Sequence, residues 1–169
     1  MPTLIIIIIA YIIIVFGLSH LVIPHLGWKQ DPIPEKIPDS LQKKIDELKD
    51  KAKNKREFLE LVYNYLGDRY HSERFNTVLK ISYAFKDLNW AWEREGFIHC
   101  QWANFLLKIS LVKSGFFRED EIRKRHCFLN FVSHQYLQIK IDNKWVDIDV
   151  DEKHKGFKIG EHNNKLFTS

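Results

Sequence analysis

The amino-acid sequence predicts an α+β domain preceded by one transmembrane helix. Residues 3–23 form a long apolar run without a charged side chain. Residues 100–113 carry apolar side chains at the spacing of a buried helix, and residues 126–151 alternate largely between apolar and polar with a period of two, which is typical of strands. A helix followed by an antiparallel sheet indicates an α+β fold. With 169 residues, 45% of them hydrophobic, the chain is long enough for one such domain.

The apolar run predicts a retained membrane anchor over residues 1–28. It has the sequence TLIIIIIAYIIIVFGLSHLVI, and the first charged side chain of the chain is Lys29. About 20 apolar residues in a helix match the ~30 Å hydrocarbon layer, and in lipid a helix is the one single-segment structure that satisfies its own backbone. The alternatives are a cleaved signal peptide and a buried core helix. A signal peptide usually has a basic start and a shorter apolar stretch, which this sequence lacks.

The charges after this run leave the side of the membrane open. Nine basic and six acidic residues lie between Lys29 and Arg56, which by the positive-inside rule favours a cytoplasmic domain. Large folded domains are nevertheless translocated regardless of such a bias. The net charge of +4 is modest, basic and acidic residues are interspersed, and no motif combines aromatic with basic residues, so we expect a solvated surface near lipid headgroups and no nucleic-acid partner.

A proline-rich spacer and a charged helical region follow. Residues 29–38 form the spacer, because prolines are concentrated there and exclude a regular helix or an inner strand. The domain then covers residues 39–169. Apolar spacing predicts a helix capped by Asp39 or Ser40 and stopped by Gly67, with a break or a free-standing stretch in its charged middle, Lys49 to Arg56. Residues 71–95 are predicted to mix helix and loop.

Cys100 lies where the buried helix begins. A free thiol with a pKa of about 8.5 is mostly protonated at neutral pH, and a helix N-terminus or a nearby imidazolium favours the reactive thiolate. The alternative is an inert core thiol. Cys127 is expected to be a core residue that alternates with Leu129 and Phe131. A disulfide between the two cysteines, possible outside the cytoplasm, would abolish the nucleophile.

The predicted strands offer a base and a carboxylate for this thiol. Asp142-Asn143 is a tight turn, and pairing around it places Asp149 near Tyr136 and diagonal to His134. A thiol nucleophile needs a base within hydrogen-bond reach and a carboxylate that holds the base in the useful tautomer. Cys100, His134 and Asp149 are therefore the candidate catalytic residues.

Two stretches of the chain resemble the transglutaminase-like superfamily. GFIHCQWANFLLKISLVKSGF resembles its nucleophile helix, and HQYLQIKIDNKWVDIDVD is similar to its His motif followed by a turn and Trp-x-x-x-Asp. The resemblance extends from about Trp90 to Asp151. It implies a papain-like fold in which Cys100 is the nucleophile, His134 the general base and acid, and Asp149 the orienting carboxylate. Peptidases, amidases, crosslinking transglutaminases and inactive binding modules all occur in this superfamily.

Two positions depart from the pattern of the superfamily. His99 stands where a small or acidic residue is more common, and it could block the site. Asp147 stands where many members have proline, and it is the second choice for the orienting carboxylate.

The expected function is a thiol-dependent hydrolase or acyltransferase that acts on amide or peptide bonds of a protein or peptide substrate, with hydrolysis favoured. No cofactor is expected. The alternatives are a catalytically inactive, membrane-tethered binding module and a protein that organises membranes through its charged helix.

Metal binding is not expected. His99-Cys100, His126-Cys127 and His134 offer imidazole and thiolate groups, but no CxxC or HxxxH spacing accompanies them. The other five histidines are expected to be scattered over the surface or at an interface: His20, His25, His71, His154 and His162.

Overall fold

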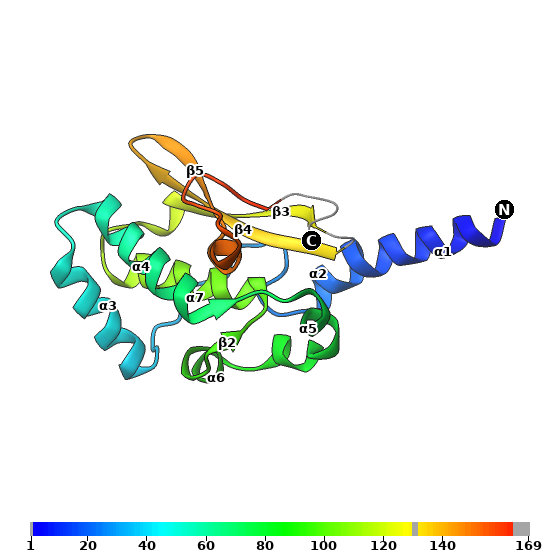
Figure 1. Cartoon of the computed structure of the whole chain (residues 1–169), viewed down its shortest axis with the longest axis horizontal. Helices are drawn as coiled ribbons and strands as arrows, with labels where there is room; N and C mark the ends of the chain where they lie inside the picture. Colours follow the sequence, from blue (N-terminus) through cyan, green and yellow to red (C-terminus); the bar gives the residue numbers. More distant parts are fainter. Residues whose placement is uncertain (1, 130–131, 164–169) are drawn as a thin grey trace.

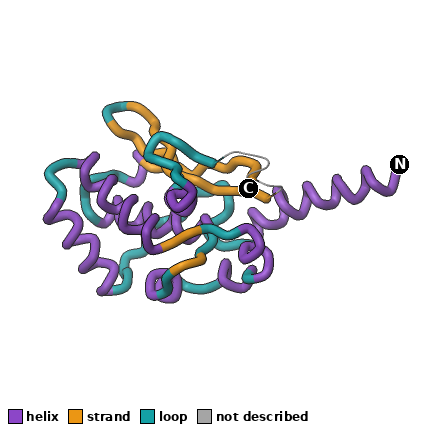
Figure 2. Tube along the Cα trace, in the orientation of Figure 1, coloured by secondary structure: helices purple, strands orange, loops and turns teal. Residues whose placement is uncertain are grey.

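The computed structural model describes residues 2–129 and 132–163, and it confirms the α+β class and the apolar N-terminal helix. That helix projects from a body in which helices lie on one side of a small antiparallel sheet (Figure 1). Figure 2 shows the two parts by element type. The helices of the body are α3 (Asp39–Lys51), α4 (Lys55–Arg69), α5 (Arg74–Leu79), α6 (Leu88–Glu93) and α7 (Cys100–Lys113), with short helices η2 (Ile81–Phe85), η3 (Glu119–Glu121) and η4 (Val150–Lys155).

The N-terminal helix is long and apolar enough to cross a membrane. It consists of α1 (Pro2–Ile12), a π-helical stretch η1 (Ile13–Leu18) and α2 (Ser19–Val22). Thr3–Val22, 20 residues, is the one candidate span within the described part of the chain. Most of its side chains are exposed, so it is not a core helix of the body.

The charged region divides into two helices, as the sequence indicated. α3 ends at Lys51, and the side chain of Asn54 caps α4 by accepting a hydrogen bond from the Glu57 N–H at 3.0 Å. The predicted cap of α3 is wrong: its N-cap is Pro38, and the Ser40 hydroxyl accepts from Trp92 Nε1 instead.

The predicted stop at Gly67 is also wrong, because α4 continues to Arg69. Gly67 is buried under the side chain of Lys153, and a Cβ built there would lie 2.8 Å from Lys153 Cβ. The glycine therefore permits close packing between α4 and η4, and it does not end the helix.

The segment between α4 and α7 mixes short elements, as predicted. β1 (Tyr70–His71) pairs in parallel with β2 (Gly96–Phe97), and α5, η2 and α6 lie between them. This pairing ties the end of α4 to the residues that lead into α7. The start of α7 is thereby held at a defined place on the body.

The core forms between α7 and the sheet. α7 buries every residue from Gln101 to Leu111 and packs against α3, α4 and the central strand. The sheet has the order β3 (Ile122–Leu129), β4 (Val132–Ile141) and β5 (Lys144–Ile148). Asp142 and Asn143 both have positive φ, 48° and 62°, as in a type I′ turn. The predicted turn and the predicted pairing of the second and third strands are confirmed.

The predicted alternation is wrong after Ile148. Leu137 pairs with Ile148, and the chain then leaves the sheet and enters η4 at Val150. Asp151 is consequently a residue of a buried 3-10 helix, where the alternation placed it on the polar face of a strand.

Residues next to the membrane-compatible helix pack against the body. Leu26 is buried, and its carbonyl accepts a hydrogen bond from His126 Nε2 at 2.8 Å. His20 is also buried, with its ring stacked on Trp28, so of the two expected places, the surface or an interface, the surface is wrong. The reason is that α2 ends on the sheet, where aromatic partners cover the imidazole. Within the spacer, Asp31 forms an ion pair with Lys124, with 2.8 Å between Oδ2 and Nζ.

The turn gives a test of the hairpin. A β-branched side chain at the φ of Asn143 costs about 1–2 kcal/mol, whereas glycine adopts this conformation freely. We therefore expect Asn143→Val to lower the free energy of unfolding by about that amount and the matched Asn143→Gly variant to retain it, measured by urea titration in detergent micelles. Equal stabilities of the two variants would contradict the observed turn.

Candidate active site

Cys100 is the first residue of α7, as predicted. Its side chain is half-buried, and His99 is the N-cap without a side-chain cap. The N–H groups of Trp102 and Ala103 both bond to the His99 carbonyl, so Cys100 and Gln101 have the first amides of the helix, which lack an acceptor within it. Those amides and the helix dipole place partial positive charge beside the thiol.

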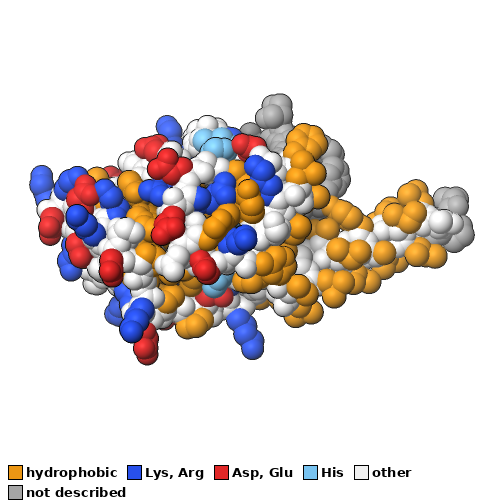
Figure 3. All heavy atoms as spheres, turned by 90° about the horizontal axis from the view of Figure 1, so that it is seen from below, with side chains coloured by type: hydrophobic (Ala, Val, Ile, Leu, Met, Phe, Trp, Pro, Cys, Tyr) orange, Lys and Arg blue, Asp and Glu red, His pale blue; other side chains and the backbone are white. Residues whose placement is uncertain are grey.

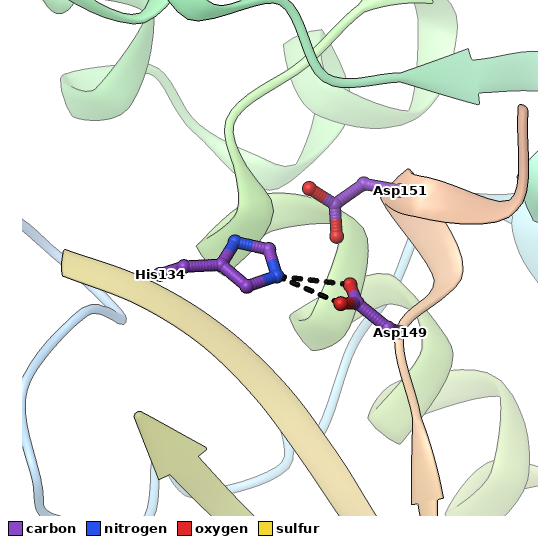
Figure 4. Close-up of side chains that lie close together, drawn as sticks. All are labelled: His134, Asp149 and Asp151. Atoms are coloured by element: carbon purple, nitrogen blue, oxygen red, sulfur yellow. Dashed lines mark hydrogen bonds and ion pairs between the residues drawn. The ribbon is translucent and has the colours of Figure 1, made fainter. Parts of the chain in front are cut away.

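His134 and Asp149 form a buried pair at the end of the β4–β5 hairpin. His134 Nε2 lies 3.0 and 2.9 Å from the two carboxylate oxygens of Asp149, as Figure 4 shows. The side chains are 5% and 0% exposed. Asp149 also accepts a hydrogen bond from the backbone N–H of Asn163 at 2.8 Å. The structure thus brings together the two residues that the sequence placed diagonally across the turn.

The environment of His134 favours its charged form. Burial of the ring lowers its pKa, but the charge and hydrogen bond of Asp149, a hydrogen bond with the Cys100 thiol and the charge of Asp151 outweigh this, and the pKa of His134 lies well above its ordinary value. Since Nε2 faces Asp149, Nδ1 is the ring nitrogen left for the thiol. Cys100 and His134 line one cavity, and Asp149 is bonded to Nε2 of the imidazole, which is the order of groups that a Cys-His-Asp relay requires.

Asp151 is a fourth residue of the site, and the sequence reasoning missed it. Its side chain is fully buried, and neither carboxyl oxygen receives a hydrogen bond from the described residues. Burial, followed by the opposing attraction of His134 and then the repulsion of Asp149 and Glu152, leaves the pKa of Asp151 well above its ordinary value. A protonated Asp151 can donate a hydrogen bond to Asp149. The spacing Asp149-Val150-Asp151 was visible in the sequence, and a strand continued in the observed register would have placed Asp151 opposite His134, on the face it shares with Asp149.

The neighbouring Glu152 shows how a buried carboxylate is normally accommodated. It is 1% exposed, and Ser72, Asn163 and Lys155 all donate to it, the last two at 2.6 and 2.8 Å. Asp151, one residue earlier, has no such donors. The contrast marks Asp151 as the unusual group of the site.

The same cluster could hold a metal ion. His134, Asp149 and Asp151 each offer one ligand atom, and these atoms lie within 4.8 Å of one another. One imidazole and two carboxylates fit a divalent cation by donor type. This set differs from the one weighed in the sequence, with which it shares only His134. The existing hydrogen bonds between His134 and Asp149, however, already engage Nε2 of His134 and both oxygens of Asp149.

A cavity of about 490 Å³ opens onto the candidate residues. Cys100, His134 and Asp151 line it, together with the strand residues Val132 and Ser133 and with residues of α5. The volume is in the range of small-molecule sites.

Comparison with protein-family models, curated proteins and solved structures finds no match. The roles of the residues consequently rest on geometry and chemistry.

Two residues that could have competed with this arrangement are engaged elsewhere. Asp147 accepts from Gln138 Nε2 at 2.6 Å and contacts His162 Nδ1 at 2.9 Å, so Asp149 is the carboxylate that reaches His134. His99 is buried, and its Nε2 lies 3.0 Å from the Lys80 carbonyl. Its ring packs edge-on against Phe97 and does not line the cavity.

Cys127 is a free, half-buried thiol, and Cys100 is also free. The Sγ of Cys127 donates a hydrogen bond to the Asn163 carbonyl at 3.1 Å. Burial is the main reason why the pKa of Cys127 is raised to about 11. Of the residues with which it was expected to alternate, Phe131 lies outside the described residues.

Asp151 gives a prediction about stability and pH. Because its pKa is higher in the folded chain than its ordinary 3.8, folding takes up a proton, and the free energy of unfolding falls as pH rises above about 4. Asp151→Asn removes this contribution. We expect the variant to lose less stability than the native chain between about pH 5 and pH 8 in urea titrations, where His134 still contributes to the decline. The control is Asp142→Asn at the exposed hairpin turn, which should keep the native dependence of the free energy of unfolding on pH. If Asp151→Asn keeps the same dependence, Asp151 is ionised in the fold.

Proposed function

We propose that the protein is a membrane-anchored cysteine hydrolase or acyltransferase with a transglutaminase-like, papain-related core. One observation carries the proposal: Cys100, at the start of a buried helix, lines the same cavity as His134, and Nε2 of His134 is held by the buried Asp149. The cavity beside these residues supports it, because a substrate carbonyl can approach the thiol there. The apolar N-terminal helix supports the membrane anchor.

The proposed reaction starts with proton transfer. Asp149 accepts the Nε2–H of His134, Nδ1 takes the proton of the Cys100 thiol, and the charge of Asp149 stabilises the imidazolium that results. The thiolate attacks the carbonyl carbon of an amide or peptide bond and forms a tetrahedral intermediate. His134 then gives its proton to the leaving amine as the C–N bond breaks, and a thioester remains on Cys100.

The start of α7 provides stabilisation for the oxyanion. The N–H groups of Cys100 and Gln101 have no acceptor in the helix, and the Cys100 N–H is next to the reacting sulfur. Donors of this kind, fixed before the reaction, contribute several kcal/mol in known enzymes, about 2.7–4 kcal/mol per donor.

Water or an amine resolves the thioester. His134 removes a proton from water and the acid is released, or an amine takes the acyl group, which is transamidation. We favour hydrolysis, because the body is small and none of the described residues forms a further domain that covers the cavity and excludes water.

A catalytically inactive, membrane-tethered binding module is the second candidate. Asp151 favours it. This buried carboxyl group receives no hydrogen bond from the described residues, and its charge also acts on His134, the residue that the relay needs as its base. The two functions differ in whether Cys100 forms a covalent acyl adduct.

The first test is the reactivity of the two thiols. At neutral pH we expect iodoacetamide to label Cys100 at least about tenfold faster than Cys127, whose thiol is buried and of high pKa. With p-nitrophenyl butyrate, intact mass measurement should show one butyryl adduct, absent from Cys100→Ala and retained in Cys127→Ser. Decay of the adduct in water indicates a hydrolase, and decay only with added amine indicates an acyltransferase. Slow labelling and no adduct would support the binding module.

The second test separates the relay from a metal site. His134→Ala should lower the labelling rate of Cys100 to about that of an ordinary thiol, since the acceptor of its proton is lost. Treatment with EDTA should leave the rate of the native chain unchanged. A change on chelation that is reversed by zinc or manganese would point instead to an ion among His134, Asp149 and Asp151.

The third test compares Asp149 with Asp147, the aspartate two residues before it. Asp149→Asn removes the charge that raises the pKa of His134, and we expect the labelling rate of Cys100 to fall about tenfold at neutral pH. Asp147→Asn is the matched control, because Asp147 contacts Gln138 and His162 and should change the rate by less than about twofold. Equal effects of the two variants would remove Asp149 from the relay.

A further inference from the structure

An exposed apolar surface borders the cavity. We call it the apolar rim, and it consists of Phe75, Val78, Leu79, Ile81 and Phe85 from α5 and η2. Phe75 is 85% and Leu79 79% exposed, which is unusual for large apolar side chains that are adjacent on one surface. No residue of the body described by the structure covers them.

The rim and the anchor helix lie at the same end of the molecule. In Figure 1, α5 is at the end of the body from which the N-terminal helix projects. Figure 3 shows hydrophobic side chains gathered at this end and continuing along the helix, while charged side chains dominate the opposite end. The rim is therefore on the part of the body that lies nearest to a membrane crossed by this helix.

The cavity opens at this end as well. Phe75, Val78 and Leu79 of the rim line it together with Cys100 and His134. Ser133 lines it too, and its Oγ lies 3.1 Å from Nε2 of His20, in the last turn of the membrane-compatible helix. A single hydrogen bond thus joins a wall of the cavity to the end of the span.

We propose that the apolar rim docks on the surface of the lipid bilayer, so that the cavity opens at headgroup depth and accepts membrane-bound amphiphiles. The apolar part of such a substrate lies along the rim, and its amide or peptide group reaches Cys100. This inference rests on the proposed function for the anchor and for the nucleophile. It narrows the substrate class from soluble peptides to molecules held in the membrane.

The charges around the rim fit a lipid surface. Lys80 and Lys86 flank it, and Lys80 Nζ lies 5.5 Å from the ring of Phe97. The acidic neighbours are engaged: Glu73 bonds to His71 and Asn76, and Asp87 caps α6. Apolar side chains flanked by lysines are typical of surfaces that lie at the headgroup boundary. A bilayer is preferred over a second copy as the occupant because the anchor already holds the rim beside it.

The depth of the rim can be measured directly in the full-length chain. In a Cys100→Ala, Cys127→Ser background, Leu79→Cys is labelled with a bimane fluorophore and reconstituted into phosphatidylcholine–phosphatidylglycerol vesicles. Lipids with a doxyl group near the headgroup should quench this label about twofold or more. The matched control is Lys144→Cys at the exposed hairpin tip, which should show no quenching.

Three outcomes would overturn the docking proposal. The label at position 79 is quenched no more than the label at position 144, the protein does not float with the vesicles, or the position 79 label forms excimers between chains, which indicates a second copy on the rim. Quenching without fast labelling of the native Cys100 would support docking and contradict the proposed catalysis, so the two failures are distinguishable.

The substrate class is tested with two reagents on native Cys100 in the same vesicles. N-dodecyl iodoacetamide partitions into the bilayer, whereas iodoacetamide stays in water, and we expect the first to react about tenfold faster. The double variant Phe75→Ser, Leu79→Ser should reduce the rate of the dodecyl reagent more than that of iodoacetamide. An equal reduction of both rates would show that the rim does not guide amphiphiles.

Discussion

The buried contact between His134 and Asp149 is the interaction on which the rest of the site depends. A charged pair with side chains 5% and 0% exposed is tolerated only when the two groups face each other and their remaining atoms are bonded. Three features of the fold achieve this. The Asp142-Asn143 turn sets the register, β5 ends at Ile148 so that Asp149 can turn inward, and the backbone of Asn163 donates to the carboxylate. Removing one partner of such a pair typically costs about 3–5 kcal/mol.

The charge balance of the site follows from this pair. One imidazole faces two carboxyl groups, and burial makes it unfavourable for both to be ionised. Asp149 has hydrogen-bond donors, and Asp151 is the group whose pKa is raised. The arrangement keeps an imidazolium next to the Cys100 sulfur without an excess of negative charge.

The position of the site on the molecule has the same importance as its chemistry. α2 ends on the sheet, where His20 and Leu26 are buried, so the span and the body are not joined by a free linker. The cavity consequently has a defined orientation relative to the helix axis. A cavity at the end of the body beside the anchor helix is supplied with a high local concentration of amphiphiles by the bilayer. A cavity at the opposite, charged end would not be.

The sequence by itself determined the features that depend on local pattern. The absence of charges in residues 3–23 defines the membrane-compatible helix, the period of two in residues 136–148 defines the hairpin, and the apolar run after Cys100 defines a buried helix that starts at the thiol. His134 and Asp149 could be paired in advance because the strand register depends on a short turn. Tertiary structure decided the rest. Gly67 lies inside a helix because η4 packs on it, and Asp151 is buried because the chain leaves the sheet after Ile148. The exposed α5 borders the cavity because the pairing of β1 with β2 brings together the two ends of the segment that contains it. These outcomes follow from contacts between residues far apart in the chain, and no local pattern of apolar and polar residues encodes them.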